Sequence, residues 1–469
     1  MNLLSTQPVG TDSTESGVPR AGRGPKWIKT MLGSRFYPAV FQWITTAAFL
    51  VIVVSVLFGS DNSGQNFGMV VTWTVWWPLL PLSFLLAGRF WCAICPFAWL
   101  TDRVQRAVGV RLSVPRVLQR HGPWIIAALF ILITFVDETW RLSVDARKTG
   151  YLLLALLVVV NFFGAFFERR TFCRYVCFIG GFAANYSRAG IVELRAGLDR
   201  CCRCRTQRCY GGTEQTPGCP VFLFAPNVED SATCHLCGNC VKNCLPDAIR
   251  ISFRRPTAEL WDIRQPRLPD TVLAGIVMGV VLIEQVVLLR LWIPLVEATG
   301  RLLDVDPYVW YPLVYGVLLA AFAAAPLVGL ALAGLLSQAL AGKPGRAEVL
   351  KNLVTFGYAI IPLALASHVA HGAYHLLTRS RTVPAAFLAM VGRFPSGIQA
   401  AWLPNSAVFP IEIAVLALGA AGSLYVSYRL ARQHAPRSPW AVFLPHAFLL
   451  LALLAANAYV VSTLIHEKG

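Results

Sequence analysis

Long apolar runs dominate this sequence and restrict what the chain can fold into. A helix needs roughly 17 to 25 predominantly apolar residues to cross the hydrocarbon core of a bilayer. Runs of this kind occur at about 36–58, 69–88, 122–140, 150–167, 271–289, 309–335, 353–377, 406–430 and 440–463. They lack the polar faces of soluble helices, and only 14% of all residues are charged. The sequence therefore predicts an all-α polytopic membrane protein with about nine transmembrane helices.

Basic residues indicate how the chain is oriented. Residues 1–35 contain no apolar stretch of signal-peptide length, so we expect a basic, disordered cytoplasmic tail. With this tail inside, roughly 32 of the 41 Lys and Arg residues fall in cytoplasmic segments, as the positive-inside rule requires. That bias and the attraction to anionic membrane lipid account for the net charge of +17 without a nucleic-acid partner. We expect a multi-pass protein of the inner (cytoplasmic) membrane.

One segment interrupts the apolar pattern. Residues 190–268 are polar and basic and contain nine of the 13 cysteines. This composition is typical of a small water-exposed domain inserted between membrane helices. We therefore divide the chain into the tail at 1–35, a four-helix membrane domain at 36–189, a cytoplasmic insert at 190–268 and a membrane domain of about five helices at 269–469.

The second half of the insert contains the cysteine motif CHLCGNCVKNCLP. Cys234, Cys237, Cys240 and Cys244 follow the spacing C-x2-C-x2-C-x3-C. In bacterial two-cluster proteins three such thiolates wrap one [4Fe-4S] cube, and the fourth, which we expect at the start of the following helix, ligates a second cube. Zinc sites usually pair two knuckles across a longer spacer, and disulfides do not persist on a reducing cytoplasmic face. The motif therefore predicts iron–sulfur ligation.

The first half of the insert carries a stretched version of the motif. Cys201, Cys204, Cys209 and Cys219 follow the spacing C-x2-C-x4-C-x9-C, with a proline next. Crossed ligation then predicts a ferredoxin-like α+β segment with two [4Fe-4S] clusters. One cluster would be held by Cys201, Cys204, Cys209 and Cys244, and the other by Cys219, Cys234, Cys237 and Cys240. Cys202 is left over as a free thiol or as a substitute for Cys201.

Four further cysteines lie at the cytoplasmic edge of the membrane. Cys92 and Cys95 follow the second apolar run in FWCAICPFAW, and Cys173 and Cys177 follow the fourth in RRTFCRYVCFIGGF. They are either inert thiols that pack a loop or a redox or metal site, because four arginines beside them would stabilise thiolates. These arginines are Arg89, Arg169, Arg170 and Arg174. The spacing leaves a cluster, another metal and a reversible disulfide open.

With these motifs, residues 36–270 resemble the membrane polyferredoxins of the NapH and NosR type. Paired cysteines of the form C-x2-3-C-P after even-numbered helices, followed by a two-cluster ferredoxin segment, carry the resemblance. It implies electron transfer from the quinol pool or a cytoplasmic donor to an extracytoplasmic oxidoreductase. The chain departs from the family at Phe178, which stands where the family has proline, and in about 200 residues of membrane domain after the insert. The partner enzyme is therefore not inherited from the family.

Ionisable residues inside the C-terminal apolar runs mark further candidate sites. His368, His371 and His375 have offsets of three and four residues, which places them on one helix face, in the outer half of the helix and near the entry of Glu412. Haem b, another metal, a quinol site and plain polar packing remain open for these histidines. Glu284 either takes a proton from quinol or bonds to a neighbouring helix. A further cofactor or a mobile quinone is needed because about 30 Å of hydrocarbon separates the insert from an outside acceptor.

Two functions of different classes fit these observations. The first is a membrane-bound iron–sulfur electron-transfer protein, of the kind that serves as a quinol dehydrogenase subunit. The second is a metal-reducing or metalloenzyme-maturation factor that uses the clusters as electron source and the outer histidines as metal site. The sequence has no Gly-rich phosphate loop and no dinucleotide-binding motif, so ATP-driven transport and direct nicotinamide oxidation are unsupported.

Overall fold

The structure is a computed structural model that describes residues 24–342, 346–393 and 399–468. Within these ranges nine helices are long and apolar enough to cross a membrane. They are Ala39–Phe58, Phe67–Ala87, Arg116–Trp140, Ala146–Phe166, Leu268–Val286, Pro307–Ala341, Glu348–Ala389, Asn405–His434 and Pro439–Leu464. Each overlaps one of the predicted apolar runs, so the multi-pass helical fold expected from the sequence is confirmed at this level.

The N-terminal membrane part consists of long helices joined by short ones near the cysteine pairs. The long helices are α2 (Ala39–Phe58), the continuous α3, η1 and α4 (Phe67–Met69, Val70–Trp76 and Trp77–Ala87), α7 (Arg116–Trp140) and α8 (Ala146–Phe166). The short ones are α5 (Phe90–Ile94), α6 (Pro96–Val108), α9 (Thr171–Tyr175) and α10 (Phe178–Ala189). The middle stretch η1 is a π-helix, a feature that often lies at functional sites.

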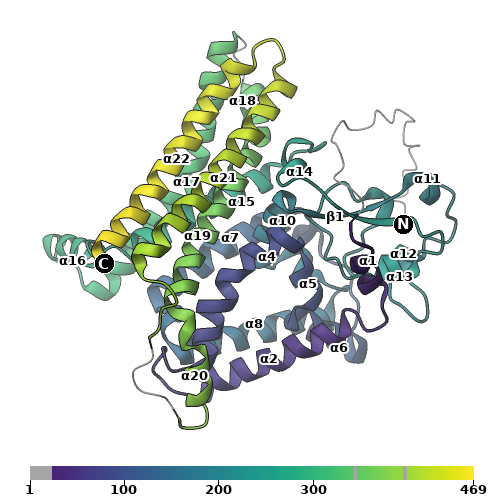
Figure 1. Ribbon diagram of the computed structural model, residues 1–469, viewed down its shortest axis with the longest axis horizontal. Coiled ribbons are helices and arrows are strands. Elements are labelled where there is room, and N and C mark those ends of the chain that lie inside the picture. Colours follow the sequence, from purple (N-terminus) through teal and green to yellow (C-terminus); the bar gives the residue numbers. More distant parts are fainter. Residues whose placement is uncertain (1–23, 343–345, 394–398, 469) are drawn as a thin grey trace.

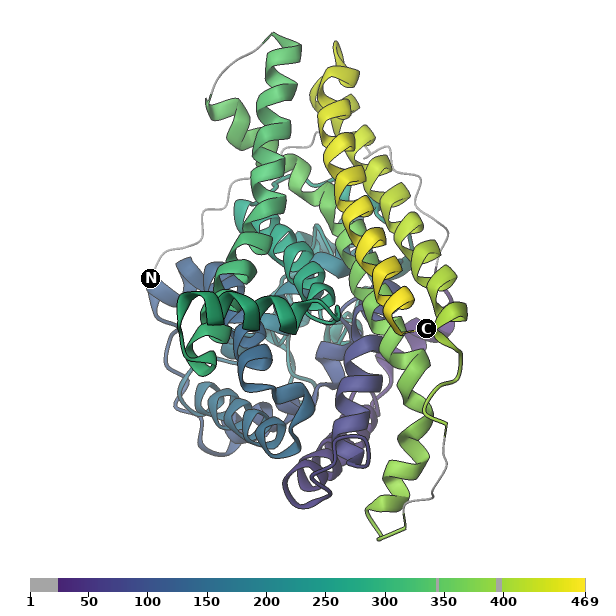
Figure 2. The same cartoon turned by 90° about the vertical axis from the view of Figure 1, so that its left-hand side faces the viewer.

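The C-terminal membrane part packs around one central helix, α19 (Ile361–Arg379). Its other helices are α15 (Leu268–Val286), α16 (Trp292–Leu303), α17 (Pro307–Ala341), α18 (Arg346–Phe356), α20 (Val383–Ala389), α21 (Asn405–His434) and α22 (Pro439–Lys468). Figures 1 and 2 both show α21 and α22 side by side. In the apolar window of the span that contains α19, 83% of the residues are buried, against 67% for the next most buried span. Helix α19 is therefore shielded by protein on nearly all sides.

Both membrane parts share one apolar core. Phe84 of α4, Phe130 of α7 and Phe182 of α10 belong to the same buried cluster as Met278 of α15 and Leu363 of α19. The two helical parts therefore pack against each other in the structure. Helix α10 contacts α4, α7, α15 and α19, so it lies at the junction between the halves.

The insert forms a small mixed unit on one side of the helices (Figure 1). Its strands β1 (Val192–Ala196) and β2 (Ile249–Phe253) pair antiparallel, with Leu194 opposite Ile251. Its short helices are α11 (Leu198–Cys201), α12 (Arg208–Gly211), η3 (Ala225–Asn227), α13 (Asn239–Asn243) and α14 (Ala258–Trp261). The strand pair bounds a loop-rich region that contains all nine cysteines of the insert.

Two local expectations were wrong. Residues 24–35 are not a disordered tail, because α1 (Lys26–Gly33) packs on the insert with Leu32 buried, while residues 1–23 lie outside the described residues. The hydroxyl of Tyr37 donates a hydrogen bond of 2.7 Å to the carbonyl of Leu236 and extends this contact. Cys244 also does not start a helix: it follows the last residue of α13, and the chain then enters β2. The apolar side of α1 accounts for the first difference, since it buries against the cysteine loop.

A buried arginine ties the insert to the membrane helices. Arg188, near the end of α10, makes ion pairs of 2.9 Å with both Asp230 of the insert and Asp270 at the start of α15. Its side chain is 1% exposed, so the pairs are largely desolvated and breaking them would leave an unpaired buried charge. This arrangement holds the cysteine loops in a defined position against the membrane part.

Candidate metal centres

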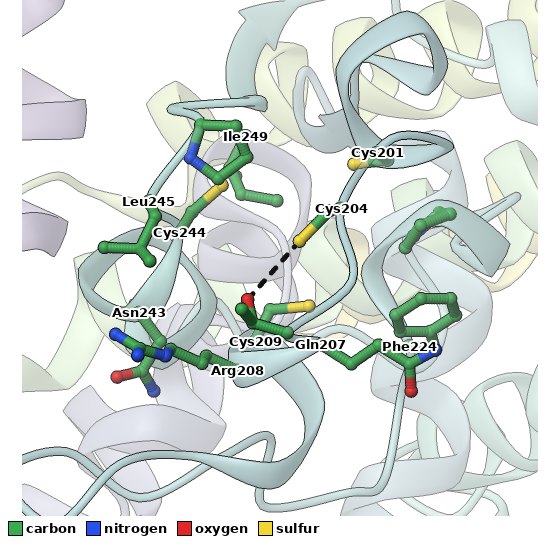
Figure 3. Close-up of a pocket in the computed structure, with 13 residues that line it drawn as sticks. Cys201, Cys204, Gln207, Arg208, Cys209, Phe224, Asn243, Cys244, Leu245 and Ile249 are labelled. Carbon is green, nitrogen blue, oxygen red and sulfur yellow. Dashed lines mark hydrogen bonds between the residues drawn. The ribbon is translucent and has the colours of Figure 1, made fainter.

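The insert contains a pocket lined by cysteines of both motifs. Cys201, Cys204 and Cys209 come from the first motif and Cys244 from the second, around about 380 Å³ of empty space. Figure 3 shows their sulfur atoms arranged around a common space. Cys202 does not line this pocket and is exposed. The structure therefore places Cys201, rather than its neighbour, with the other three thiols.

A second pocket of the insert is lined by the complementary set. Cys234, Cys237 and Cys240 come from the second motif and Cys219 from the first, around about 440 Å³ of empty space. The rest of its lining is mostly apolar and includes Leu194, Val221, Ala225 and Leu236. The fold thus brings together the two crossed sets of four thiols that the cysteine spacing predicted.

Backbone conformation and N–H groups support these thiols. The amide N–H of Leu223 donates to the sulfur of Cys219 at 3.3 Å, and that of Ala248 donates to the sulfur of Cys244 at 3.2 Å. Gly238 has a φ of +77° between two cysteines of the second motif, which lets the loop wrap inward. Hydrogen bonds of this kind favour the thiolate form and, in iron–sulfur sites, adjust the reduction potential.

The chemistry of the donor sets fits a group with several metal atoms. Burial raises the pKa of Cys234 to about 11 and of Cys237 to about 12, and the neighbouring Cys219 adds to both shifts. Metal ligation requires thiolates, so it would release protons and supply the positive charge that these sulfurs need. Among the described residues no group of three or more His, Cys, Asp or Glu side chains could hold a single metal ion. The four thiols of each pocket line a volume rather than converge on a point.

The four cysteines at the membrane edge also come together in the structure. Cys177 lies within electrostatic range of Cys92, Cys95 and Cys173, and Cys95 lies within range of Cys92 and Cys173. Burial raises the pKa of Cys95 to about 12, and it raises the pKa of the Cys173 and Cys177 thiols as well. Two pairs that are about 80 residues apart in the sequence therefore form one buried set.

Arg170 is one of the four neighbouring arginines. It lies within electrostatic range of the edge thiols Cys95 and Cys173. It is buried and makes a two-point ion pair with Asp102, with an Nε–Oδ1 distance of 2.9 Å and an Nη2–Oδ2 distance of 2.5 Å. The other three bond to groups of the insert or to a neighbouring carboxylate, and Arg89 Nη2 also approaches Gly180 near Cys177. Arg89 donates to the carbonyl of Ala232, Arg169 donates to the carbonyl of Cys219, and Arg174 pairs with Glu168.

His235 is a residue that the cysteine spacing did not single out. It lines the second pocket, is 4% exposed, and its Nδ1 has no hydrogen-bond partner among the described residues. Burial lowers the pKa of His235 well below its usual value, and the charges of Arg89 and Arg170 lower it further. The imidazole is therefore neutral, and it lines the second pocket within electrostatic range of Arg89 and Arg170. The spacing of the motif did not indicate where a histidine between the two cysteines of a C-x2-C pair would lie.

The membrane histidines divide into two environments. His368 is 2% exposed, its Nδ1 lies 3.2 Å from the hydroxyl of Tyr186, and its ring packs against Trp77 and Phe182. Its Nε2 has no hydrogen-bond partner in the described part of the chain. The rings of His371 and His375 contact each other, with centroids 4.9 Å apart.

The two carboxylates proposed with the histidines also lie in different surroundings. Glu412 of α21 is buried, within electrostatic range of Tyr374, which neighbours His375 on α19. Glu284 lies within electrostatic range of Asp137 and Glu138 at the end of α7. The structure therefore places Glu412 near Tyr374 and His375, and it places Glu284 within electrostatic range of Tyr186, which lies beside His368.

Comparison with known proteins finds similar proteins, but those described below have no assigned function. No family model matches the chain, and no solved structure matches it. It is 27% identical over 174 residues to an uncharacterized protein of Methanocaldococcus jannaschii, which covers 36% of this chain and 65% of that relative. A second uncharacterized protein of the same organism is 24% identical over 185 residues, covering 36% of this chain and 74% of the relative. The chain thus spans less than two thirds of the first relative's length.

Proposed function

We propose that this protein is a membrane-bound iron–sulfur electron-transfer protein whose insert holds two [4Fe-4S] clusters. The arrangement of the two cysteine pockets carries this proposal. Each pocket takes three cysteines from one motif and its fourth from the other, which is what crossed ligation of two cubes requires. A [4Fe-4S] cluster supplies one-electron transfer, and the thiolates hold it in place.

The residues around the two pockets indicate which pocket a soluble partner reaches and which pocket leads to the membrane part. The lining of the first includes the polar residues Gln207, Arg208 and Asn243 beside apolar ones, and its Cys204 is only partly buried. The second is lined mainly by apolar side chains and lies beside the arginines of the membrane edge. Cys209 and Cys240 are within electrostatic range of each other, so the pockets are neighbours. We infer that a soluble donor or acceptor reaches the first pocket and the membrane part is reached through the second.

A quinone is the membrane partner that we favour. His368 presents an unpartnered, buried Nε2 beside the hydroxyl of Tyr186. A buried nitrogen without a hydrogen bond is costly, and a quinone carbonyl or quinol hydroxyl would supply the missing partner. In this proposal the insert faces the cytoplasm, as the distribution of basic residues predicts, and electrons pass between it, the quinone pool and an extracytoplasmic redox partner.

The alternative of a metal-reducing or maturation factor requires a metal site among the outer histidines. His368 instead contacts Tyr186, while His371 and His375 contact each other. In the described ranges no three suitable side chains could hold a metal ion together. We therefore favour electron transfer over metal handling, and we favour quinone over haem b or another metal at His368.

The proposal is tested by the iron and acid-labile sulfide content of the full chain purified without oxygen. We expect Cys237→Ser and Cys240→Ala each to lose about four iron atoms, because each removes one ligand of a cube. Cys202→Ser is the matched control and should keep the wild-type content, since this exposed thiol lines neither pocket. Wild-type protein without iron and sulfide would contradict the proposal, as would unchanged iron in both pocket variants.

A further inference from the structure

The edge cysteines form a third set of four thiols between the insert and the membrane helices. We propose that Cys92, Cys95, Cys173 and Cys177 hold a third [4Fe-4S] cluster, which links the second pocket to the membrane part. This inference rests on the proposed function, and the experiment below separates the failure of one from the failure of the other.

The two cysteine pairs have the same local structure. In each, a spanning helix ends, a short helix carries the first cysteine, and the second cysteine directly precedes a longer helix. The N–H of Gly180 donates to the sulfur of Cys177 at 3.3 Å, and the N–H of Ala98 lies close enough to favour the thiolate of Cys95. Each repeat thus presents one cysteine sulfur at the N-terminus of a helix, where the helix dipole stabilises a negatively charged group.

The four edge sulfurs lie near one another. They are mutually within electrostatic range, all are free thiols, and they do not form a group that could hold one metal ion among the described residues. The second pocket of the insert shares these properties, because its four thiols are likewise free and within electrostatic range of one another. Gly180 borders the set closely: a Cβ there would lie 3.1 Å from Arg89 Nη2 and 3.4 Å from the carbonyl oxygen of Cys173. A multi-iron cube fits this geometry better than zinc does.

A fixed positive group lies beside the set. Arg170 is held by the two-point pair with Asp102, and its third nitrogen lies 3.4 Å from the carbonyl oxygen of Cys92. A cluster with four thiolate ligands carries net negative charge, which a buried guanidinium stabilises at short range. Thiols that only pack a loop would gain nothing from a charged group held in this position.

The same arginines connect the edge set to the second pocket. Arg170 lies within electrostatic range of Cys237 as well as of Cys95 and Cys173. Arg169 donates to the carbonyl of Cys219 at 3.2 Å. The side chain of Arg169, which precedes the second edge pair, is thereby bonded to the backbone of the second pocket.

Aromatic rings continue from the edge set into the membrane part. Trp91, next to Cys92, contacts Trp76 with ring centroids 5.7 Å apart, and Trp76 contacts Trp77 at 6.0 Å. Trp77 in turn contacts His368 at 5.9 Å. The edge set therefore lies between the second pocket and the proposed quinone site. In the transfer itself, the group held by the second pocket is oxidised by one electron and the group held by the edge cysteines is reduced by one, without any bond or proton moving.

The test uses the full chain purified without oxygen. Three cubes predict about twelve iron atoms per chain, and reduction with dithionite should give about three spins in quantitative EPR. Cys92→Ser combined with Cys177→Ser removes one ligand from each repeat and should leave about eight iron atoms and two spins. Cys202→Ser again serves as the control with unchanged content.

Each outcome decides a different point. About eight iron atoms and two spins in the wild type, unchanged in the double variant, would overturn the third cluster and leave the proposed function intact. Zinc or a disulfide at the edge cysteines of the wild type would also overturn it. A wild type without iron would overturn both proposals. If the double variant does not fold, the spin count of the wild type alone decides between two clusters and three.

Discussion

At the scale of single residues, Asp102 illustrates how one side chain controls a buried site. It is the partner that holds the guanidinium of Arg170 beside the edge thiols. The Arg170 side chain is 5% exposed, whereas that of Asp102 is 27% exposed. Removing the carboxylate therefore leaves a buried charge without compensation.

The first prediction follows from this pair. We expect Asp102→Asn to lower the free energy of unfolding by about 3 kcal/mol, since breaking a buried ion pair strands the remaining charge. Glu168→Gln, which removes the longer and more exposed pair with Arg174, should cost less than about 1 kcal/mol. Thermal unfolding in detergent measures both. Equal effects of the two variants would contradict the assignment.

A second residue, His368, separates electron transfer from cluster binding. Oxidation of the reduced protein by a quinone analogue should slow about tenfold or more in His368→Leu, while iron content stays at the wild-type level. The reason is the loss of the nitrogen that we propose to contact the quinone. His446→Leu is the control, because His446 is also buried and its Nε2 also lacks a partner among the described residues, but its ring stacks on Phe356 rather than against Trp77 and Phe182. Equal slowing in both variants would argue against a quinone at His368.

At the scale of elements, α1 shows how a short helix outside the membrane supports a metal-binding loop. Leu32 is buried in the same cluster as Leu236, next to Cys237. Gly238 approaches α1 so closely that a Cβ would lie 2.2 Å from the carbonyl oxygen of Leu32. The position of α1 therefore depends on a glycine within the cysteine motif.

The third prediction uses this close approach. Gly238→Ala should destabilise the insert and reduce its iron content, because it adds a backbone clash to the strain of a positive φ. Gly392→Ala is the matched control: its φ of +74° is similar, but a Cβ there meets nothing within 4 Å. We expect this control to cost only about 1 kcal/mol and to keep its iron. Iron measured after gel filtration compares the two, and an equal loss would show that the clash has no role.

At the scale of the whole molecule, the insert lies on one side of the helical parts and α16 lies on the opposite side (Figure 1). The ion pairs of Arg188 and the shared apolar core keep the insert and both helical parts in contact. The orientation of this assembly in the bilayer is a prediction from the basic residues.

The fourth prediction tests that orientation. Cys202 is an exposed thiol of the insert. A membrane-impermeant thiol reagent should label it in inside-out vesicles and not in intact spheroplasts, because the insert is expected in the cytoplasm. Cys202→Ser should lose the label, which identifies the site. Labelling of Cys202 in intact spheroplasts would place the insert outside and contradict the orientation.

The sequence by itself determined the features that depend on local spacing. Nine apolar runs each overlap one of the nine membrane-length helices in the described residues, since run length reports directly on the ability to cross a bilayer. The spacing of eight cysteines likewise predicted which four would share each pocket, because crossed ligation follows from short intervals along the chain. The sequence did not reveal the packing of α1. The polar and basic residues of 24–35 predicted a disordered tail, and the apolar side of the helix was not taken into account.

Only the tertiary structure decided which distant residues meet. Tyr186 and His368 are 182 positions apart, and Arg170 and Asp102 are 68 apart. The two members of each pair are nevertheless in direct contact. The meeting of the edge cysteines, the burial of His235 and the neighbours of Glu284 and Glu412 also depend on how helices pack. Helices that are apolar on all sides do not encode in their pattern which face meets which neighbour. The packing around α10 and α19 therefore set the edge site and the histidine environments, for which the sequence offered only candidates.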